Sequence, residues 1–208
     1  PDETIEEGVM EEMLTALDAE LREIVSINET AYYPYYGMMR YHLGWVDARF
    51  APTHTEAGKR MRPLLCLLSC EAVGGNWRDA LPLAAAIELV HNFSLIHDDI
   101  EDNSPARRGR AAVWKVWGIA QALNAGDGMF VLARLALNRL AARSVGAERW
   151  AQISLGFDQA TFALCQGQFL DLSFEARESV TVEEYLQMIH GKTAALIAAA
   201  TQLGAMIG

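Results

Sequence analysis

Cysteine is scarce in this sequence, and the few positions it occupies argue against two common classes of small protein. The 208 residues include three cysteines, Cys66, Cys70 and Cys165, and none belongs to a CxxC or Cys/His array. An odd count without such spacing indicates neither a disulfide framework nor a zinc site. Cys66 and Cys70 stand one helical turn apart in an apolar segment, so we expect core residues in a reducing compartment.

Positive charge is also in short supply. The chain has 17 Lys and Arg residues against 27 Asp and Glu residues, which gives a formal net charge of −10. Nucleic-acid-binding proteins carry a basic face that neutralises phosphates, so this composition predicts no nucleic-acid partner. The short basic segments that do occur point to a small anionic ligand.

The sequence shows neither a leader pattern nor a run of apolar residues long enough to span a bilayer. Its N-terminus, PDETIEEGVMEE, is acidic, and its most apolar run, residues 193–208, is shorter than the roughly 20 residues that a membrane span needs. We therefore expect a cytoplasmic protein without a membrane span. Because the chain starts without Met and stops inside an apolar run, we also expect a truncated chain.

Strand-like alternation is missing, whereas helical periodicity runs through most of the sequence. In the first segment, Ile5, Val9, Met13, Leu17 and Leu21 recur at steps of four residues. The predicted helices are 4–28, 35–50, 63–73, 79–102, 112–123, 127–144, 147–172, 181–190 and 193–207. Several are apolar over much of their circumference. The sequence thus predicts one all-α domain over residues 1–208, arranged as a large helical bundle.

Among the charged segments, DDIED at residues 98–102 is the most informative. On a helix, Asp98 and Asp102 lie about 5 to 6 Å apart on one face, with Asp99 at its edge. Carboxylates at a helix C-terminus oppose the helix dipole, which favours a counter-charge. Mg²⁺ takes oxygen ligands and leaves positions open for substrate phosphates, so it would supply that charge. A solvated acidic helix end is the alternative for this segment taken alone.

Three basic segments could bind an anion. GKRMRP at residues 58–63 places Lys59 and Arg62 at the start of a helix, whose first turn suits Pro63. ARRGR carries Arg107 and Arg108, whose guanidinium groups match phosphate bidentately. Taken alone, GKRMRP is better explained as a basic cluster on the surface.

The third segment, HGKTAALI, predicts a further helix beginning at Lys192 and Thr193, which is another anion position. GKT is also the tail of a phosphate-binding P-loop. That interpretation fails because Leu186 replaces the leading glycine and no strand precedes the segment.

Polar residues within apolar helices add further candidates. His91 precedes Asp98 by two helical turns on the same face, where it could reach a bound ligand or be a core histidine. Gln168 and Asp171 stand three residues apart in another apolar helix, and buried polar groups of this kind need partners or line a cavity.

Taken in chain order, GKRMRP, ELVHNFSLIHDDIED, RRGR, GQFLDL and GKTAALI resemble the trans-isoprenyl diphosphate synthases, the polyprenyl synthetase family that includes farnesyl and geranylgeranyl diphosphate synthases. The resemblance covers roughly residues 55–205, and DDxxD followed closely by RRG is its most specific part. It implies a helical bundle around a deep central cavity, Mg²⁺ as cofactor, isopentenyl diphosphate and an allylic diphosphate as substrates, and a homodimer.

The resemblance also implies a role for each matching residue. Mg²⁺ would be bound by Asp98 and Asp102, with Asp99 in support, and the allylic diphosphate by Arg107 and Lys192. Isopentenyl diphosphate would be bound by Lys59, Arg62, His91 and Arg108. The reacting centre would be lined by Gln168, Asp171 and Thr193. Phe93 and Ser94, five and four positions before the first aspartate, would set the chain length, and a single aromatic there favours a C20 over a C15 product.

One feature of the family is missing, since no second aspartate-rich motif follows Thr193 in these residues. For that reason we expect this truncated chain by itself to be a doubtful catalyst. Two alternatives also stay open. A class I terpene cyclase would share the fold and the aspartates but would not need Lys59, Arg62 and Arg108. A non-catalytic partner subunit would fit the missing motif but not the intact DDIED and RRG.

Overall fold

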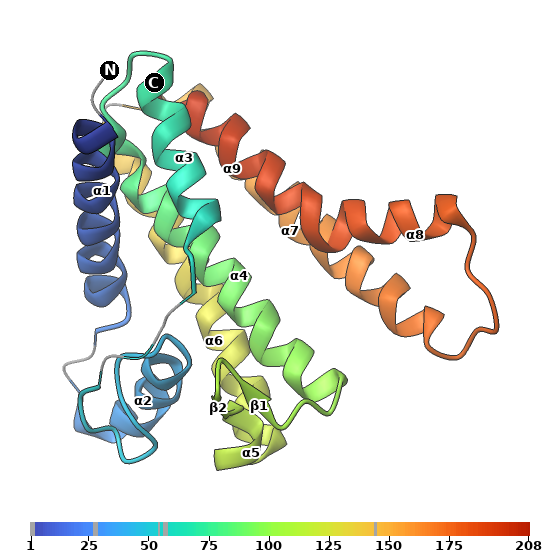
Figure 1. The fold of residues 1–208 in the computed structure, drawn as a ribbon. Helices are drawn as coiled ribbons and strands as arrows, with labels where there is room; N and C mark the ends of the chain where they lie inside the picture. The colour runs from blue at the N-terminus through green and yellow to red at the C-terminus, as the bar shows by residue number, and fades with distance from the viewer. Residues whose placement is uncertain (1–2, 27–28, 54, 56–57, 144) are drawn as a thin grey trace. The chain divides into compact units, whose positions relative to one another are not determined.

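The computed structural model describes residues 3–26, 29–53, 55, 58–143 and 145–208, and most of them are helical (Figure 1). The elements in chain order are α1 (Glu3–Ile24), η1 (Thr30–Tyr32), α2 (Tyr33–His42), α3 (Met61–Ala72), η2 (Trp77–Ala80), α4 (Leu81–Glu101), β1 (Ala106–Arg107), β2 (Arg110–Ala111), α5 (Val113–Trp117), α6 (Ile119–Asn138), η3 (Arg139–Ala142), α7 (Ala147–Phe174), α8 (Val182–Ile189), η4 (His190–Ala194, a π-helix) and α9 (Ala195–Ala205). The predicted all-α fold is confirmed. Within the described residues, its one sheet is the short antiparallel pair β1–β2.

The chain divides into two compact units, and each is described by itself. Unit 1 consists of residues 1–60 and 88–136, and unit 2 consists of residues 61–87 and 137–208. Helix α4 contributes its first residues to unit 2 and the rest, including its acidic end, to unit 1. The single domain and the central cavity inferred from the sequence stay predictions.

In unit 1, α1 buries one apolar face and is joined to a later segment by polar contacts. Met13, Leu17 and Leu21 follow at intervals of four residues, and none has exposed surface. On the same helix, Asp18 accepts a hydrogen bond of 3.3 Å from Arg60, whose side chain is only 9% exposed. This partly buried contact connects α1 to the residues that precede α3.

Helix α4 is apolar around most of its circumference. Ala84, Ile87, Leu89 and Val90 have no exposed surface. Among the described residues, the segment Trp77–Glu101 is the one long and apolar enough to cross a membrane, and 78% of its most apolar window is buried within the protein. Such burial is typical of a core helix.

The packing of α3 against α9 is the main contact in unit 2. Gly204 lies so close to the Cys66 carbonyl that a Cβ on Gly204 would clash with it. Cys66 and Cys70 are both fully buried on α3, and burial raises the pKa of the Cys66 thiol. As expected, these cysteines belong to the core.

In unit 1, two predicted helix boundaries are wrong. The helix predicted over 35–50 ends at His42, because the backbone turns at Gly44, with φ of 83°, and the Trp45 N–H bonds back to the Arg40 carbonyl. The break predicted between residues 123 and 127 lies instead at Gly118, with φ of 84°, and α6 continues from Ile119 to Asn138.

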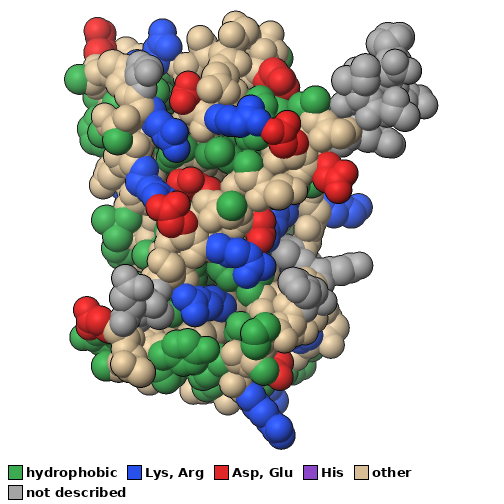
Figure 2. Space-filling view, turned by 90° about the vertical axis from the view of Figure 1, so that its left-hand side faces the viewer, with side chains coloured by type: hydrophobic (Ala, Val, Ile, Leu, Met, Phe, Trp, Pro, Cys, Tyr) green, Lys and Arg blue, Asp and Glu red, His purple; other side chains and the backbone are tan. Residues whose placement is uncertain are grey.

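Charge of both signs is distributed over the surface. On the face in Figure 2, Lys and Arg side chains are interspersed with Asp and Glu side chains.

Candidate functional site

The acidic end of α4 places its three aspartates in different surroundings. Asp99 is only 1% exposed, Asp98 is partly buried and Asp102 is exposed. The Asp102 N–H donates to the Asp98 carbonyl at 2.9 Å, so the helical turn continues through both residues. Asp98 and Asp102 are therefore one turn apart, as predicted from their spacing.

A tight hairpin follows and returns the chain toward these aspartates. Arg108 and Gly109 have φ of 51° and 73°, and Arg107 pairs with Arg110 across them. A two-residue turn with both φ values positive matches the twist of antiparallel strands, and glycine in the second position makes it accessible. The Ser104 N–H also donates to the Asp99 carbonyl at 2.8 Å, which fixes the start of the turn.

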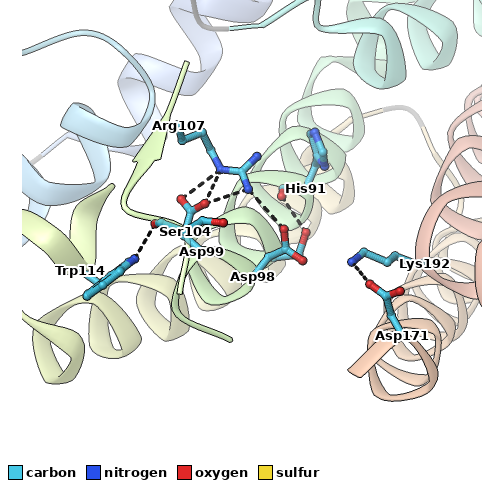
Figure 3. Close-up of polar contacts among 9 residues, drawn as sticks. His91, Asp98, Asp99, Ser104, Arg107, Trp114, Asp171 and Lys192 are labelled. Atoms are coloured by element: carbon cyan, nitrogen blue, oxygen red, sulfur yellow. Dashed lines mark hydrogen bonds and ion pairs between the residues drawn. The ribbon is translucent and has the colours of Figure 1, made fainter. Parts of the chain in front are cut away.

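Arg107, on β1, binds two of the aspartates (Figure 3). Its Nε donates to both carboxylate oxygens of Asp99, at 2.9 and 3.0 Å, and its Nη2 donates to Asp98 Oδ2 at 3.2 Å. Burial raises the pKa of the Asp99 carboxyl, and the Arg107 charge opposes that shift. One guanidinium thus balances two adjacent carboxylates.

Arg110, on β2, was not among the predicted site residues, and it fastens the hairpin to the end of α2. Its Nη1 donates to Thr55 Oγ1 at 2.8 Å and its Nη2 donates to the Val46 carbonyl at 2.7 Å. Its guanidinium lies 3.9 Å from the centre of the Tyr41 ring, and the Tyr41 hydroxyl donates to the Ala111 carbonyl. The third arginine of RRGR is therefore structural.

The residues predicted to bind isopentenyl diphosphate are partly brought together. Lys59 follows Gly58, where an added Cβ would lie 3.1 Å from an Arg108 terminal nitrogen, so the chain before Lys59 runs beside that guanidinium. Partial burial lowers the pKa of Arg108, and Glu88 acts in the opposite direction. Arg62 lies in the first turn of α3, in unit 2, with Pro63 beside it as predicted.

Three polar residues near Arg108 were missed by the sequence interpretation. Glu88 and Asn92 are 3% and 0% exposed, and Asn92 Nδ2 donates to Glu88 Oε1 at 2.9 Å. His42, at the end of α2, has a pKa well below its usual range because it is buried and because Arg108 is near. The i, i+4 spacing of Glu88 and Asn92 in an apolar helix was a usable signal, because buried polar groups need partners. No sequence pattern marks His42.

In unit 2, α7 and η4 hold a second ion pair. Lys192 Nζ donates to Asp171 Oδ2 at 2.5 Å (Figure 3). A Cβ added to Gly167 would clash with the backbone of Lys192, and one added to Gly191 would lie 2.7 Å from the Ala163 carbonyl. These two glycines allow the close backbone approach that puts Lys192 beside Asp171.

The remaining residues predicted in unit 2 are Gln168, partly buried on α7, and Thr193, exposed on η4. The expectation that a helix begins at Lys192 and Thr193 is wrong, because α8, η4 and α9 follow one another without a break. The segment that joins α8 to α9, η4, is a π-helix, a form that often occurs at functional sites.

Phe93 and Ser94, the predicted chain-length residues, lie on α4 in unit 1. The Phe93 ring is 8% exposed and packs 5.2 Å from the centre of the Phe130 ring and 5.8 Å from the His97 ring. The Ser94 hydroxyl donates to the His91 carbonyl. Phe93 is thus held by aromatic packing against α6.

The described residues contain no group of three or more His, Cys, Asp or Glu side chains arranged to hold a metal. Asp98 and Asp102 nonetheless fit Mg²⁺, which proteins commonly bind through one or two carboxylates together with substrate phosphates. The chemistry of these two carboxylates is therefore compatible with Mg²⁺.

Comparison with known proteins identifies the class of protein that this fold and site define. Residues 45–208 match the Polyprenyl synthetase family. The chain belongs to this family, and the resemblance seen in its motifs is confirmed.

Particular relatives are named for two different products. A (2E,6E)-farnesyl diphosphate synthase of Mycobacterium tuberculosis is 41% identical over 95% of this chain and 50% of its own length. A geranylgeranyl diphosphate synthase of the same species is 39% identical over 89% of this chain and 51% of its own. A solved polyprenyl synthetase from Streptomyces coelicolor superposes with a TM-score of 0.86 and 39% identity, over 95% of this chain and 56% of that one. The chain spans about half the length of the curated relatives it matches.

Proposed function

We propose that the protein containing these residues is a prenyltransferase that condenses an allylic diphosphate with isopentenyl diphosphate into a short-chain trans-polyprenyl diphosphate. Membership of the Polyprenyl synthetase family supports the proposal. The observation that carries it is the charged cluster at the end of α4. There Arg107 forms ion pairs with both Asp98 and Asp99, and Arg108 follows it in the turn between β1 and β2. A cluster with both signs of charge suits a diphosphate that binds together with a cation.

The chemistry explains why both signs are needed. The allylic C–O bond breaks, and its electron pair leaves with the diphosphate while an allylic cation forms. The double bond of isopentenyl diphosphate attacks that cation, and the proton then lost goes to the departing diphosphate. Arg107 and Lys192 stabilise the charge that develops on the leaving group. This reaction needs no serine or cysteine nucleophile.

The proposal assigns Mg²⁺ to Asp98 and Asp102. A bound divalent cation supplies Lewis-acid stabilisation of the leaving diphosphate. In this assignment Asp99 orients Arg107 through its two hydrogen bonds and supports the metal site indirectly. Asp99 as a direct metal ligand stays a prediction.

For the product, we favour C20 over C15. The support is the single aromatic, Phe93, before the aspartates, with Ser94 in the adjacent position. Relatives named for both products have nearly the same identity to this chain, so overall similarity favours neither. A homodimer and a cytoplasmic location also stay predictions, which light scattering and cell fractionation would test.

The experiment uses the full natural chain that contains these residues. Purified protein is incubated with Mg²⁺, isopentenyl diphosphate and dimethylallyl, geranyl or farnesyl diphosphate, and the dephosphorylated products are separated by chromatography. We expect elongated products only when both substrates and Mg²⁺ are present. Consumption of the allylic substrate alone would show a cyclase instead, and no turnover by folded protein would reject the enzyme proposal.

A further inference from the structure

Helix α1 reaches the segment before α3 through a polar contact within unit 1. Asp18 Oδ1 accepts a hydrogen bond of 3.3 Å from Arg60 Nη2. The Arg60 side chain is only 9% exposed, and Asp18 is its hydrogen-bond partner within the part of the chain that the structure describes. A largely buried guanidinium needs a counter-charge, so the position of Arg60 depends on this carboxylate.

The backbone at this contact has a conformation that non-glycine residues rarely adopt. Arg60 has φ of 48°, and Gly58, two residues earlier, has φ of 85°. At a non-glycine residue such a conformation costs free energy and persists only where the surroundings hold it. Arg60 is directed into the protein, whereas Lys59, between the two positions, is exposed. The contact with Asp18 supplies an interaction that holds Arg60 in this conformation.

The same segment lies beside Arg108, which lines a pocket of unit 1. A Cβ on Gly58 would lie 3.1 Å from an Arg108 terminal nitrogen. Burial lowers the pKa of Arg108, the charges of Arg107 and Arg60 lower it further, and Glu88 acts in the opposite direction. Arg60 and Arg108 are therefore close enough to repel each other, and a carboxylate on Arg60 reduces that repulsion.

A second arginine of α1 contacts the chain that follows α2. Arg22 Nε donates to Asp18 Oδ2 at 2.6 Å, and the Arg22 guanidinium lies 4.5 Å from the centre of the Trp45 ring. Asp18 thus accepts hydrogen bonds from both arginines, one with each carboxylate oxygen. Through these contacts α1 is joined to the connection between α2 and α3 near its start, at Trp45, and near its end, at Arg60.

We propose that Asp18 and Arg60 are positioning residues, and that their contact keeps Lys59 exposed beside Arg108 so that both cations can bind isopentenyl diphosphate. This rests on the proposed function, which assigns Lys59 and Arg108 to that substrate. Neither Asp18 nor Arg60 touches the substrate in this account. Loss of the contact should therefore weaken isopentenyl diphosphate, whereas the allylic diphosphate, which is assigned to other residues, should be little affected.

Steady-state kinetics of the full-length protein tests the contact with a double-mutant cycle. Asp18→Ala removes the carboxylate, and Arg60→Gln keeps much of the side chain but removes its charge. Each should raise KM for isopentenyl diphosphate about fivefold or more, with kcat and KM for the allylic substrate changed less than about twofold. The double variant should resemble the single ones, because all three lack the same contact.

Two further variants separate positioning from a general effect on the helix. Glu11→Ala removes an exposed acid two turns earlier on α1 and should leave both KM values unchanged. Asp18→Glu keeps a carboxylate within reach of the long Arg60 side chain and should restore KM for isopentenyl diphosphate to within about twofold. Additive effects in the double variant, or equal effects on both substrates, would overturn the proposal.

Hydrogen exchange and calorimetry give measurements that do not depend on turnover. In Asp18→Ala we expect faster exchange of the amides of residues 58–60 and weaker binding of isopentenyl diphosphate alone, with exchange elsewhere in unit 1 as in Glu11→Ala. Unchanged exchange at residues 58–60 would overturn the proposal, and so would faster exchange throughout unit 1, which would indicate a merely structural contact. If folded wild-type protein does not bind isopentenyl diphosphate, the proposed function fails, and exchange still decides whether Asp18 holds this segment.

Discussion

Each unit holds a candidate ion pair, and the two pairs differ in how the fold around them is built. In unit 1, Arg107 bonds to Asp98 and Asp99, and Asp99 is buried. A hairpin turn and backbone hydrogen bonds on both sides fix the same residues. In unit 2, Lys192 makes one contact with Asp171, and both side chains are about a third exposed. The first pair is set by a network, whereas the second is set by one close approach of two backbones.

This difference predicts different sensitivities. A network in which each group has several partners tolerates the loss of one contact, because the others keep its geometry. A pair positioned by a glycine contact is sensitive to one added methyl group, since that group would clash with the facing backbone and push the two helices apart. Substitutions in the network of unit 1 should therefore change kinetic constants with little loss of stability. A substitution at the glycine contact of unit 2 should lower the free energy of unfolding.

The largest effect is expected at Asp98. Asp98→Asn keeps the volume of the side chain but removes a carboxylate that the proposal gives to Mg²⁺, so we expect kcat/KM to fall by at least about 10²-fold. Circular dichroism should show the same helix content as the wild type. Glu101→Gln, an exposed acid at the same helix end, is the matched control and should change the rate little. Near-normal turnover by Asp98→Asn would contradict the assignment.

The next effect concerns the backbone approach in unit 2. Gly167→Ala places a methyl group against the backbone of Lys192, and overpacking of this kind costs about 1 to 3 kcal/mol. We expect a lower free energy of unfolding in urea and a lower kcat. Gly146→Ala serves as control, because a Cβ on Gly146 meets nothing within 4 Å. Equal stability of the two variants would show that α7 and η4 pack less closely at Gly167 than the structure indicates.

A smaller effect on stability is expected at Asp99. Burial raises the pKa of this carboxyl, so the folded state binds its proton more tightly than the unfolded state does. Its contribution to stability is therefore greatest at low pH and declines as the pH rises through the window from about 3.9 to the raised pKa.

Asp99→Asn should abolish that decline and alter the free energy of unfolding at pH 7 by less than about 1 kcal/mol, since Asp98 still binds Arg107. Because Arg107 loses two hydrogen bonds, KM for the allylic substrate should rise about tenfold. Urea unfolding from pH 3 to 7 and steady-state kinetics provide the two measurements. A large loss of stability with unchanged KM would reverse this interpretation.

The smallest effect is expected at the start of α8. Thr181 and Glu184 form a capping box, and Arg177 donates to both Glu184 oxygens, which lowers the pKa of Glu184 to about 2. The stabilisation is complete above the ordinary pKa of 4.5 and is lost as the pH falls toward 2. Glu184→Gln should remove this pH dependence. Hydrogen exchange of the first α8 amides checks it, and a variant with the wild-type pH profile would disagree.

Much of the fold follows from local sequence patterns, and the errors have identifiable causes. Pro63 correctly marked the first turn of α3, and period-four apolar residues correctly marked α1. Gly126 falls in the gap between the helices predicted over 112–123 and 127–144, but it lies within α6, where a Cβ would clash with the His97 ring. From sequence alone, a glycine needed for close packing cannot be distinguished from a turn glycine, because the residue that packs against it is not known.

The candidate site was predicted unevenly for the same reason. Asp98 and Arg107 belong to neighbouring motifs, so the sequence marked both as candidates, although their roles stay predictions. His42 lies far in sequence from Arg108, and no motif connects them, so only the fold shows that they line one pocket. The roles of Gly167 and Gly191 likewise depend on a helix crossing that the sequence does not describe.

The most direct test of the central claim is whether the full-length protein binds Mg²⁺ and an allylic diphosphate together. Calorimetry with a non-ionising allylic thiodiphosphate, at several Mg²⁺ concentrations, measures this coupling. We predict weak binding of Mg²⁺ alone, an affinity for the analogue that rises with Mg²⁺, and loss of that rise in Asp98→Asn. Binding of the analogue that is independent of both Mg²⁺ and Asp98 would contradict the proposal that these carboxylates bind the cation of the substrate.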